Sequence, residues 1–177
     1  SGSVFKKGQS YTGALRILKV ILGYDYLWLN VRVKGGAYGV MNGVGRFGDG
    51  YFVSYRDPKL QETAQVYERV PAYIESFDAD ERDMTKYVIG TISDLDAPLL
   101  PPYKGAKADS AWFSHVTDEM FEQERREILT AGPEDIRALA GIVREVLSEG
   151  SLCVIGNAEC IRKCEGMFGE IKNLFQM

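Results

Sequence analysis

The chain has 177 residues, of which 45% are hydrophobic and 26% are charged, with a formal net charge of −4. This length and apolar content suffice for one hydrophobic core, so we expect a single domain. The acidic balance argues against nucleic acid as a partner, because proteins that bind phosphate backbones concentrate Lys and Arg. No apolar run reaches the roughly 20 residues that a membrane-spanning helix needs, so no membrane partner is expected either.

The first part of the chain predicts one helix followed by a β-hairpin. Apolar residues recur at helical spacing over residues 11–30, with Ser10 or Thr12 available as the N-cap. Gly35 and Gly36 should end this helix, since glycine reaches positive φ without steric cost. Two strands are then predicted, over 37–46 and 51–55, joined across residues 48–50, because the Asp-Gly pair found there favours a hairpin turn.

Two further helices are predicted between residues 57 and 95. Asp57 serves as the N-cap and Pro58 as the first residue of one helix, which Pro71 should kink or split because proline has no N–H to donate. Asp78 and Glu81 resemble a capping box at the start of the next helix.

Residues 97–115 hold three of the six prolines and no hydrophobic period. This pattern predicts a long loop, which is unusual inside a compact domain and suggests docking, substrate contact or packing over a neighbouring domain. Of these, packing over a neighbouring domain is the preferred interpretation.

The last third of the chain predicts two helices, a strand and a final helix. Thr117 caps a helix through residue 129, and Gly132 and Pro133 separate it from a helix through residue 147. Residues 152–155 are typical of a short buried strand. The final helix carries one apolar face, made by Ile161, Cys164, Phe168, Ile171 and Phe175.

The order of these elements predicts an α+β fold. The predicted fold is a small antiparallel or mixed sheet with helices packed on one face. No internal repeat is present.

Several patterns that could carry chemistry have simpler explanations. Residues 43–48 match the G-x-G-x-x-G dinucleotide fingerprint, but a turn and a second strand follow where that motif requires a helix, so a nucleotide-binding module is only a distant alternative. The single histidine, His115, lies in the predicted loop without a nucleophile motif. The alternating charges of residues 117–127 are typical of a solvated helix face.

The three cysteines favour a reducing compartment, because their spacing matches no disulfide scaffold. Cys160 and Cys164 are four residues apart and could bridge a metal ion from one helix. Since no further His or Cys lies near them in the sequence, we interpret them as small buried hydrophobic residues.

Arg32 and Tyr38 are the strongest candidates for a functional site. Arginine presents a fork of donors and tyrosine a phenolic donor, so together they could orient a peptide carbonyl and stabilise negative charge that develops on it. The alternative is structural: Arg32 forms a surface ion pair and Tyr38 packs on the hairpin.

Four segments resemble the C-terminal region of presequence proteases, which are zinc metallopeptidases of the pitrilysin or insulin-degrading type. They are LW at 27–28, RVKGGAYGV at 32–40, GYFVSYRDP at 50–58 and ADERDMTKYVIGTIS at 79–93. The resemblance runs through nearly the whole chain and includes the closing VIGN at 154–157 and the helix predicted after it.

The resemblance implies a clamshell of four similar α+β domains. An N-terminal domain would supply the inverted His-x-x-Glu-His zinc motif, and the C-terminal half would close over the peptide. It implies that Arg32 and Tyr38 complete the active site, that Tyr38 bonds the substrate backbone near the scissile carbonyl, and that Gly35 and Gly36 shape the turn between them and belong to the substrate-binding site.

This sequence contains no His-x-x-Glu-His, so zinc is expected in another domain of the full-length enzyme and not here. Residues 1–3 are interpreted as a cloning remnant, and residues 4–177 as a single C-terminal domain fragment that begins inside its domain. Its expected partners are peptide substrates and the N-terminal catalytic half of the same polypeptide. We expect the fragment alone neither to bind stoichiometric zinc nor to cleave peptides.

Two matters stay open from the sequence. The same fold also serves as a non-catalytic structural or interaction subunit, which is the chief alternative to a peptidase. The expected location is the cytoplasm of a bacterium, with the mitochondrial matrix as the alternative.

Overall fold

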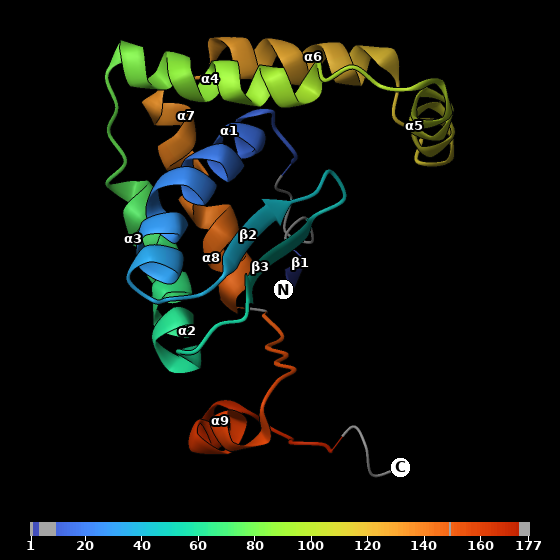
Figure 1. Ribbon diagram of the computed structural model, residues 1–177. Helices are drawn as coiled ribbons and strands as arrows, with labels where there is room; N and C mark the ends of the chain where they lie inside the picture. Colours follow the sequence, from blue (N-terminus) through green and yellow to red (C-terminus); the bar gives the residue numbers. More distant parts are fainter. Residues whose placement is uncertain (1, 4–9, 149, 174–177) are drawn as a thin grey trace.

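The computed structural model describes residues 2–3, 10–148 and 150–173. Within these residues the chain forms a small antiparallel sheet with helices packed on one face (Figure 1). The α+β class predicted from the sequence is therefore confirmed. Helices α1 and α8 lie against the sheet, and α4 and α6 lie side by side beyond α1.

The first long helix begins as α1 (Ala14–Ile21) and continues through two stretches of wider π-helical turns, η2 (Leu22–Tyr26) and η3 (Trp28–Val33). The prediction of a helix over residues 11–30 is thus confirmed from residue 14 onward. Neither predicted N-cap residue is the cap. That position belongs to Gly13, whose N–H donates to Glu127 Oε2 at 2.6 Å. A carboxylate from a distant helix therefore closes this helix end.

The sheet has the strand order β1-β3-β2 and is antiparallel throughout. Strand β2 (Gly39–Val44) pairs along its whole length with β3 (Asp49–Tyr55), and β1 (Gly2–Ser3) pairs with the first two residues of β3. Both strands of the predicted hairpin are confirmed.

The position predicted for the hairpin turn is wrong. The chain reverses over residues 45–48, where Gly48 has a φ of 90° and its N–H donates to Gly45 O at 3.0 Å. Asp49 and Gly50 already belong to β3. A Cβ atom on Gly50 would lie 2.4 Å from Val146 Cγ2, so glycine is required there for close packing on α8 and not for the turn.

Pro71 marks the division between α2 (Leu60–Glu68) and α3 (Val70–Glu75), as predicted. The predicted cap of α2 is wrong, because Asp57 lies in the preceding turn. Its Oδ1 accepts the N–H of Lys59 at 2.9 Å, and Lys59 occupies the N-cap position.

Helix α4 (Glu81–Leu95) also begins with a cap other than the predicted one. Asp80 Oδ1 accepts the N–H of Asp83 at 2.8 Å, so Asp80 replaces Asp78 as the N-cap. The helix itself is confirmed.

The long loop predicted over residues 97–115 is wrong, because α5 (Pro101–Phe113) occupies most of it. Pro101 and Pro102 lie in the first turn, where a missing N–H costs nothing, and the alanines and lysines that follow favour helix. None of its residues is buried, and the helix projects from the body (Figure 1).

The next segment forms three helices where the sequence predicted two, because the helix predicted through residue 147 is divided at Leu139. Thr117 caps α6 (Asp118–Thr130) by accepting the N–H of Met120. After Gly132 the chain forms α7 (Pro133–Ala138) and α8 (Ala140–Ser148).

The C-terminal segment departs from its prediction. Residues 152–155 form no strand in the structure, and Ile155 is 78% exposed. The expected final helix is limited to α9 (Ala158–Lys163) and the short η4 (Glu165–Met167). Of its predicted apolar face, Phe175 lies outside the described residues. Figure 1 shows α9 well separated from the helices that pack on the sheet.

The core is a single cluster in which α1, η2, η3, α3, α7 and α8 supply most of the buried side chains. Its largest fully buried members are Ile17, Ile21, Leu22, Leu27, Ile74, Ile128, Ile136, Val31, Val70, Val143 and Val146. No helix in the described residues is long and apolar enough to span a membrane.

Candidate functional site

The turn after η3 determines how Arg32 and Tyr38 are presented. Gly36 has a φ of 86°, which favours glycine, and its N–H donates to Arg32 O at 3.0 Å. A Cβ atom on Gly35 would lie 2.3 Å from Val31 O, so a side chain has no room there. Both glycines are therefore needed for the chain to leave the helix and enter the hairpin within a few residues.

Arg32 lies on the last turn of η3, half-buried. Its guanidinium carbon is 3.9 Å from the centre of the Trp28 ring, a cation–π contact between residues four apart on the helix. The structural alternative predicted a surface ion pair for Arg32. Among the described residues, however, no carboxylate forms an ion pair with it. Stacking on one face leaves the edge donors of the guanidinium available.

Tyr38 lies just before β2 and is 64% exposed. Its N–H donates to Tyr55 O at 3.0 Å, and the two rings meet edge to face with centroids 5.8 Å apart. The ring thus packs on the hairpin, as the structural alternative predicts. In the described part of the chain its hydroxyl has no hydrogen-bond partner, so the donor is free for a ligand.

Arg56 is a neighbour of Tyr38 that the sequence analysis did not identify as a site residue. It has a φ of 50°, a left-handed conformation that costs a non-glycine residue of order 1 kcal/mol. Its guanidinium carbon lies 5.7 Å from the Tyr38 ring centre and 5.4 Å from that of Tyr55. The signal was present in the GYFVSYRDP segment, where this arginine directly follows the strand.

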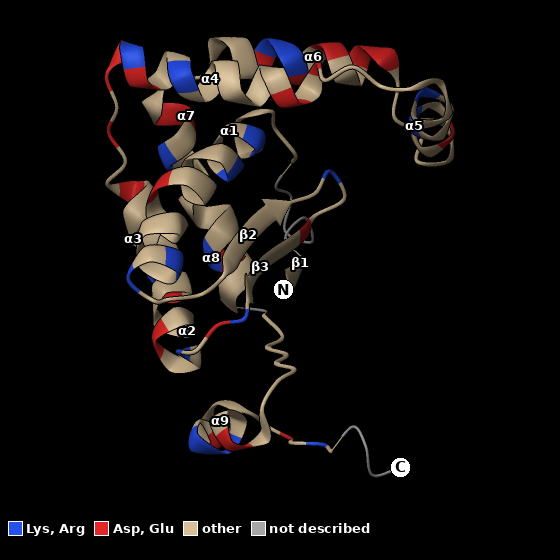
Figure 2. Cartoon of the chain, in the orientation of Figure 1, with Lys and Arg blue, Asp and Glu red and all other residues tan. Residues whose placement is uncertain are grey.

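The face of the sheet that the helices leave uncovered is apolar and adjoins Tyr38. The exposed side chains of this outer face belong to alternate residues of β2 and β3: Met41, Tyr51, Val53 and Tyr55. Figure 2 shows the two strands almost without charge. Together with Tyr38 and Arg56, the outer face offers apolar contact area beside phenolic and cationic donors, a combination that suits a peptide.

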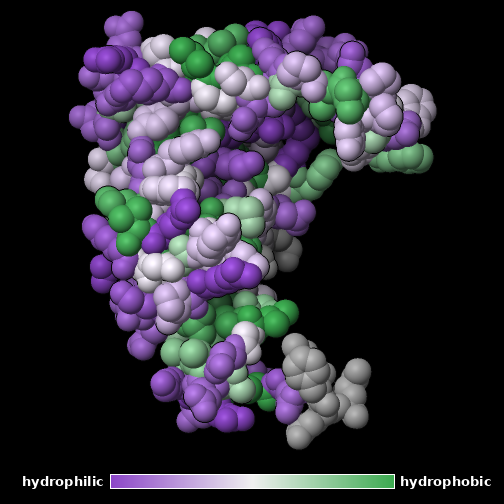
Figure 3. All heavy atoms as spheres, in the orientation of Figure 1, coloured by the Kyte–Doolittle hydropathy of each residue, from purple (hydrophilic) through white to green (hydrophobic). Residues whose placement is uncertain are grey.

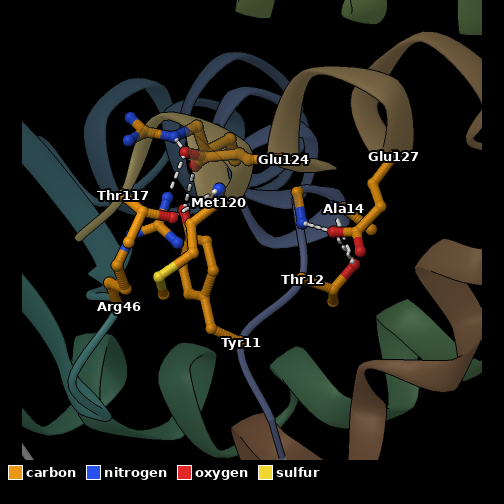
Figure 4. A network of polar contacts seen from close by, with 10 residues as sticks. Tyr11, Thr12, Ala14, Arg46, Thr117, Met120, Glu124 and Glu127 are labelled. Atoms are coloured by element: carbon orange, nitrogen blue, oxygen red, sulfur yellow. Dashed lines mark hydrogen bonds and ion pairs between the residues drawn. The ribbon is translucent and has the colours of Figure 1, made fainter. Parts of the chain in front are cut away.

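A buried ion cluster lies at the opposite end of the hairpin. Glu124 is only 3% exposed and receives hydrogen bonds from Tyr11, Arg16 and Arg46, of which the contacts of Tyr11 and Arg46 measure 2.5 Å (Figure 4). The Arg46 guanidinium also lies over the Tyr11 ring, at 4.7 Å. Burial and then the bond to Glu124 raise the pKa of Tyr11 to about 12.

The cluster corrects the interpretation of residues 117–127 as a solvated face. Glu124 turns inward and fastens α6 to the hairpin turn through Arg46. Since two guanidinium groups and one phenol satisfy its carboxylate, we assign the cluster a structural role.

The remaining candidates do not assemble a site. Residues 43–48 form the end of β2 and the turn into β3, so the dinucleotide fingerprint lacks its helix. His115 is exposed, with a φ of 55°. Cys160 is exposed and Cys164 is partly exposed, so the interpretation as buried hydrophobic residues is wrong. Nowhere in the described ranges do three His, Cys, Asp or Glu side chains gather as a metal ion would require.

Comparison with known proteins identifies the class to which this fold and these residues belong. The model of the PreP C-terminal domain family matches residues 1–158. The match covers Arg32, Gly35, Gly36 and Tyr38 as well as the sheet and most of the helices. The chain belongs to the PreP C-terminal domain family.

Two curated relatives show how the chain relates to longer proteins. Protein HypA of Clostridium perfringens is 44% identical over 175 residues, which is 99% of this chain and 18% of that protein. Presequence protease 1, chloroplastic/mitochondrial, of Arabidopsis thaliana is 31% identical over the whole chain, which covers 16% of that protein. The chain therefore spans less than a fifth of the length of these relatives.

Proposed function

We propose that this chain is the substrate-binding, chamber-closing C-terminal domain of a zinc metallopeptidase that degrades peptides. Its relation to presequence proteases supports the reaction class. One observation carries the proposal for the site. Among the described residues, no carboxylate pairs with Arg32 and no group accepts a hydrogen bond from the Tyr38 hydroxyl.

In the proposed reaction the two residues act on the peptide. The Tyr38 hydroxyl donates a hydrogen bond to the substrate backbone near the scissile carbonyl, and the fork of Arg32 stabilises negative charge that grows on the carbonyl oxygen. Trp28 holds the guanidinium in place by stacking, which reduces the entropy lost when substrate binds.

Zinc does not fit the residues of this chain, because its described side chains supply no set of ligands. We propose that the ion belongs to another domain of the longer polypeptide. The proposed partners are accordingly a peptide and the N-terminal catalytic half.

The test is steady-state kinetics of the full-length enzyme with a peptide substrate. Tyr38→Phe and Arg32→Ala should each lower kcat/KM by about a hundredfold, the effect of removing one donor to a developing oxyanion. Zinc content should stay unchanged, since neither residue is a ligand.

Matched variants control for general damage. Tyr103→Phe removes an equally exposed hydroxyl from α5 and should leave turnover unchanged. Arg32→Lys keeps the charge but loses the planar fork, and should recover only part of the rate. Wild-type turnover in both Tyr38→Phe and Arg32→Ala would refute the assigned roles. A full-length protein without peptidase activity would instead support the non-catalytic subunit.

The cytoplasm remains the proposed location. The relatives include a bacterial protein and proteins named as mitochondrial or chloroplastic.

A further inference from the structure

The loop that follows β3 packs against the glycine turn that follows η3. Lys59 Nζ donates a hydrogen bond to Lys34 O at 3.4 Å. A Cβ atom on Gly36 would lie 3.5 Å from Pro58 Cγ, so Pro58 packs close to this glycine. These contacts hold Arg56, the first residue of the loop, beside the turn.

Two aromatic rings fix the position of the Arg56 guanidinium. Its carbon lies 5.7 Å from the ring centre of Tyr38 and 5.4 Å from that of Tyr55, and the two rings meet edge to face. Contacts of this kind attract the cation to the rings without using its N–H donors. The exposed arginine therefore keeps its fork of donors for an acceptor.

No described carboxylate neutralises Arg56. The acidic residue next to it, Asp57, turns its Oδ1 to the N–H of Lys59 at 2.9 Å. None of the ion pairs among the described residues involves Arg56, Lys34 or Lys59. Figure 2 shows these basic segments at the end of η3 and in the loop between β3 and α2. They form a local excess of positive charge in a chain of net charge −4.

The backbone gives no reason for an arginine at this position. The φ of Arg56, 50°, lies in the left-handed region, which disfavours residues with a Cβ atom. Glycine would adopt the same conformation without strain. Strained residues of this kind gather at ligand-binding sites, where the side chain is needed in one place.

The outer face of the sheet has room for an extended peptide. The hairpin lies on a side of the molecule that is hollowed between α5 and the C-terminal segment (Figures 1 and 3). The exposed side chains continue from Tyr38 and Arg56 along β3 as Tyr55, Val53 and Tyr51. A peptide that reaches Tyr38 therefore passes close to Arg56.

We propose that Arg56 binds a carboxylate of the substrate peptide, either an acidic side chain or the C-terminus, and so selects peptides with a negative charge near the scissile bond. This inference rests on the proposed function, which places the scissile carbonyl beside Tyr38. The 5.7 Å between the guanidinium and the Tyr38 ring corresponds to about two residues of extended peptide, at about 3.3 Å each. The selected carboxylate thus belongs within about two residues of the scissile bond, where the fork can hold both of its oxygens.

Steady-state kinetics of the full-length enzyme with matched peptides test the selection. The peptides differ only in carrying Glu, Gln or Lys at one of the two positions on either side of the scissile bond. At one position kcat/KM should be about tenfold higher for Glu than for Gln, the effect of a hydrogen bond to a charged group, and lowest for Lys. A peptide that ends two residues after the scissile bond, with a free or an amidated C-terminus, tests the terminal carboxylate as the source.

Variants of Arg56 show whether it causes the preference. Arg56→Gly removes the guanidinium and relaxes the backbone, so it should fold and bring the ratio of Glu to Gln peptides to about one. Arg56→Glu should reverse the preference in favour of Lys. Arg82→Ala removes the same charge from an exposed position on α4 and should leave the ratio unchanged. A wild-type enzyme that prefers neither carboxylate, or a preference that survives Arg56→Gly, overturns the proposal but not the peptidase function.

Equilibrium binding to the full-length protein after removal of zinc separates the two proposals. No peptide is cleaved under these conditions, so the fluorescence anisotropy of labelled peptides measures affinity alone. The wild type should bind the preferred carboxylate peptide about tenfold more tightly than its neutral counterpart, and Arg56→Gly should bind both equally. This difference in a protein that never cleaves peptides would keep the carboxylate site and refute the peptidase function. Equal affinities in the wild type would refute the carboxylate site, whatever the turnover.

Discussion

Glu124 illustrates a residue whose role depends on distant partners. Its three donors are separated from it by 113, 108 and 78 positions in the sequence. Helical periodicity places Glu124 among other charges and assigns it to the solvated face. Only the packing of α6 against α1 and the hairpin turn shows that this one carboxylate is buried.

Replacing Glu124 with Gln should destabilise the chain by about 3 kcal/mol, because it leaves two guanidinium groups, one of them largely buried, without a counter-charge. Urea unfolding of this chain measures the loss. Glu122→Gln is the matched control: this side chain is 71% exposed and pairs with Arg126 on the surface, where such a pair contributes about 0.5 kcal/mol. Equal losses in the two variants would show that the cluster is not a buried ion site.

The candidate site shows what residue patterns can and cannot predict. The segment RVKGGAYGV predicted Arg32 and Tyr38 as donors and the two glycines as the turn between them, and local backbone chemistry explains why both glycines are needed. Arg56 directly follows the second hairpin strand in the GYFVSYRDP segment, but this position alone does not predict that it lies beside Tyr38. Its left-handed conformation and its position beside Tyr38 depend on how β3 ends against β2.

At the scale of elements, the contact of β3 with α8 is unusually close. The missing side chain of Gly50 makes room for the fully buried Val146. Gly50→Ala should therefore cost about 2 kcal/mol through overpacking. Gly39→Ala, at a strand position with no heavy atom within 4 Å of the added carbon, should cost much less in the same unfolding experiment.

A double-mutant cycle tests whether the clash with Val146 causes the loss of stability in Gly50→Ala. If the clash with Val146 is responsible, Gly50→Ala should be better tolerated in a Val146→Ala background than in the wild type. An unchanged cost would point to the strand backbone instead.

Two elements were mispredicted for opposite reasons. Pro101 and Pro102 suggested a loop, but they lie in the first turn of α5, where proline is tolerated, and the residues after them favour helix. Residues 152–155 have a strand pattern, but a strand requires a paired neighbour, and no described strand pairs with them in this structure. A helix satisfies its own hydrogen bonds, whereas a strand cannot.

For the whole molecule, buried tyrosines predict loss of stability at alkaline pH. Burial raises the pKa of Tyr11, Tyr67 and Tyr73 from 10.0 to about 12, and that of Tyr87 is raised as well. Below pH 10 these phenols are neutral in both states. Between about pH 10 and 12 the unfolded chain releases protons that the folded chain retains, so the free energy of unfolding falls as pH rises.

Thermal unfolding of this chain from about pH 9 to about pH 11.5 checks whether stability falls as pH rises. The Tm should fall above pH 10, and Tyr11→Phe should weaken the fall because it removes one of the shifted groups. Tyr24→Phe, which removes an exposed phenol, is the control and should leave the slope unchanged. A Tm that does not fall in this window would contradict the burial of these hydroxyls.

The sequence by itself determined the α+β class, most helices, the two hairpin strands and the family motif, because each is encoded by neighbours within one or two turns or by a short segment. Only the tertiary structure decided which glutamate is buried, where the hairpin turns, which glycine packs on a helix and which arginine lies beside Tyr38. Those features depend on groups far apart in the chain that meet only when the helices close over the sheet.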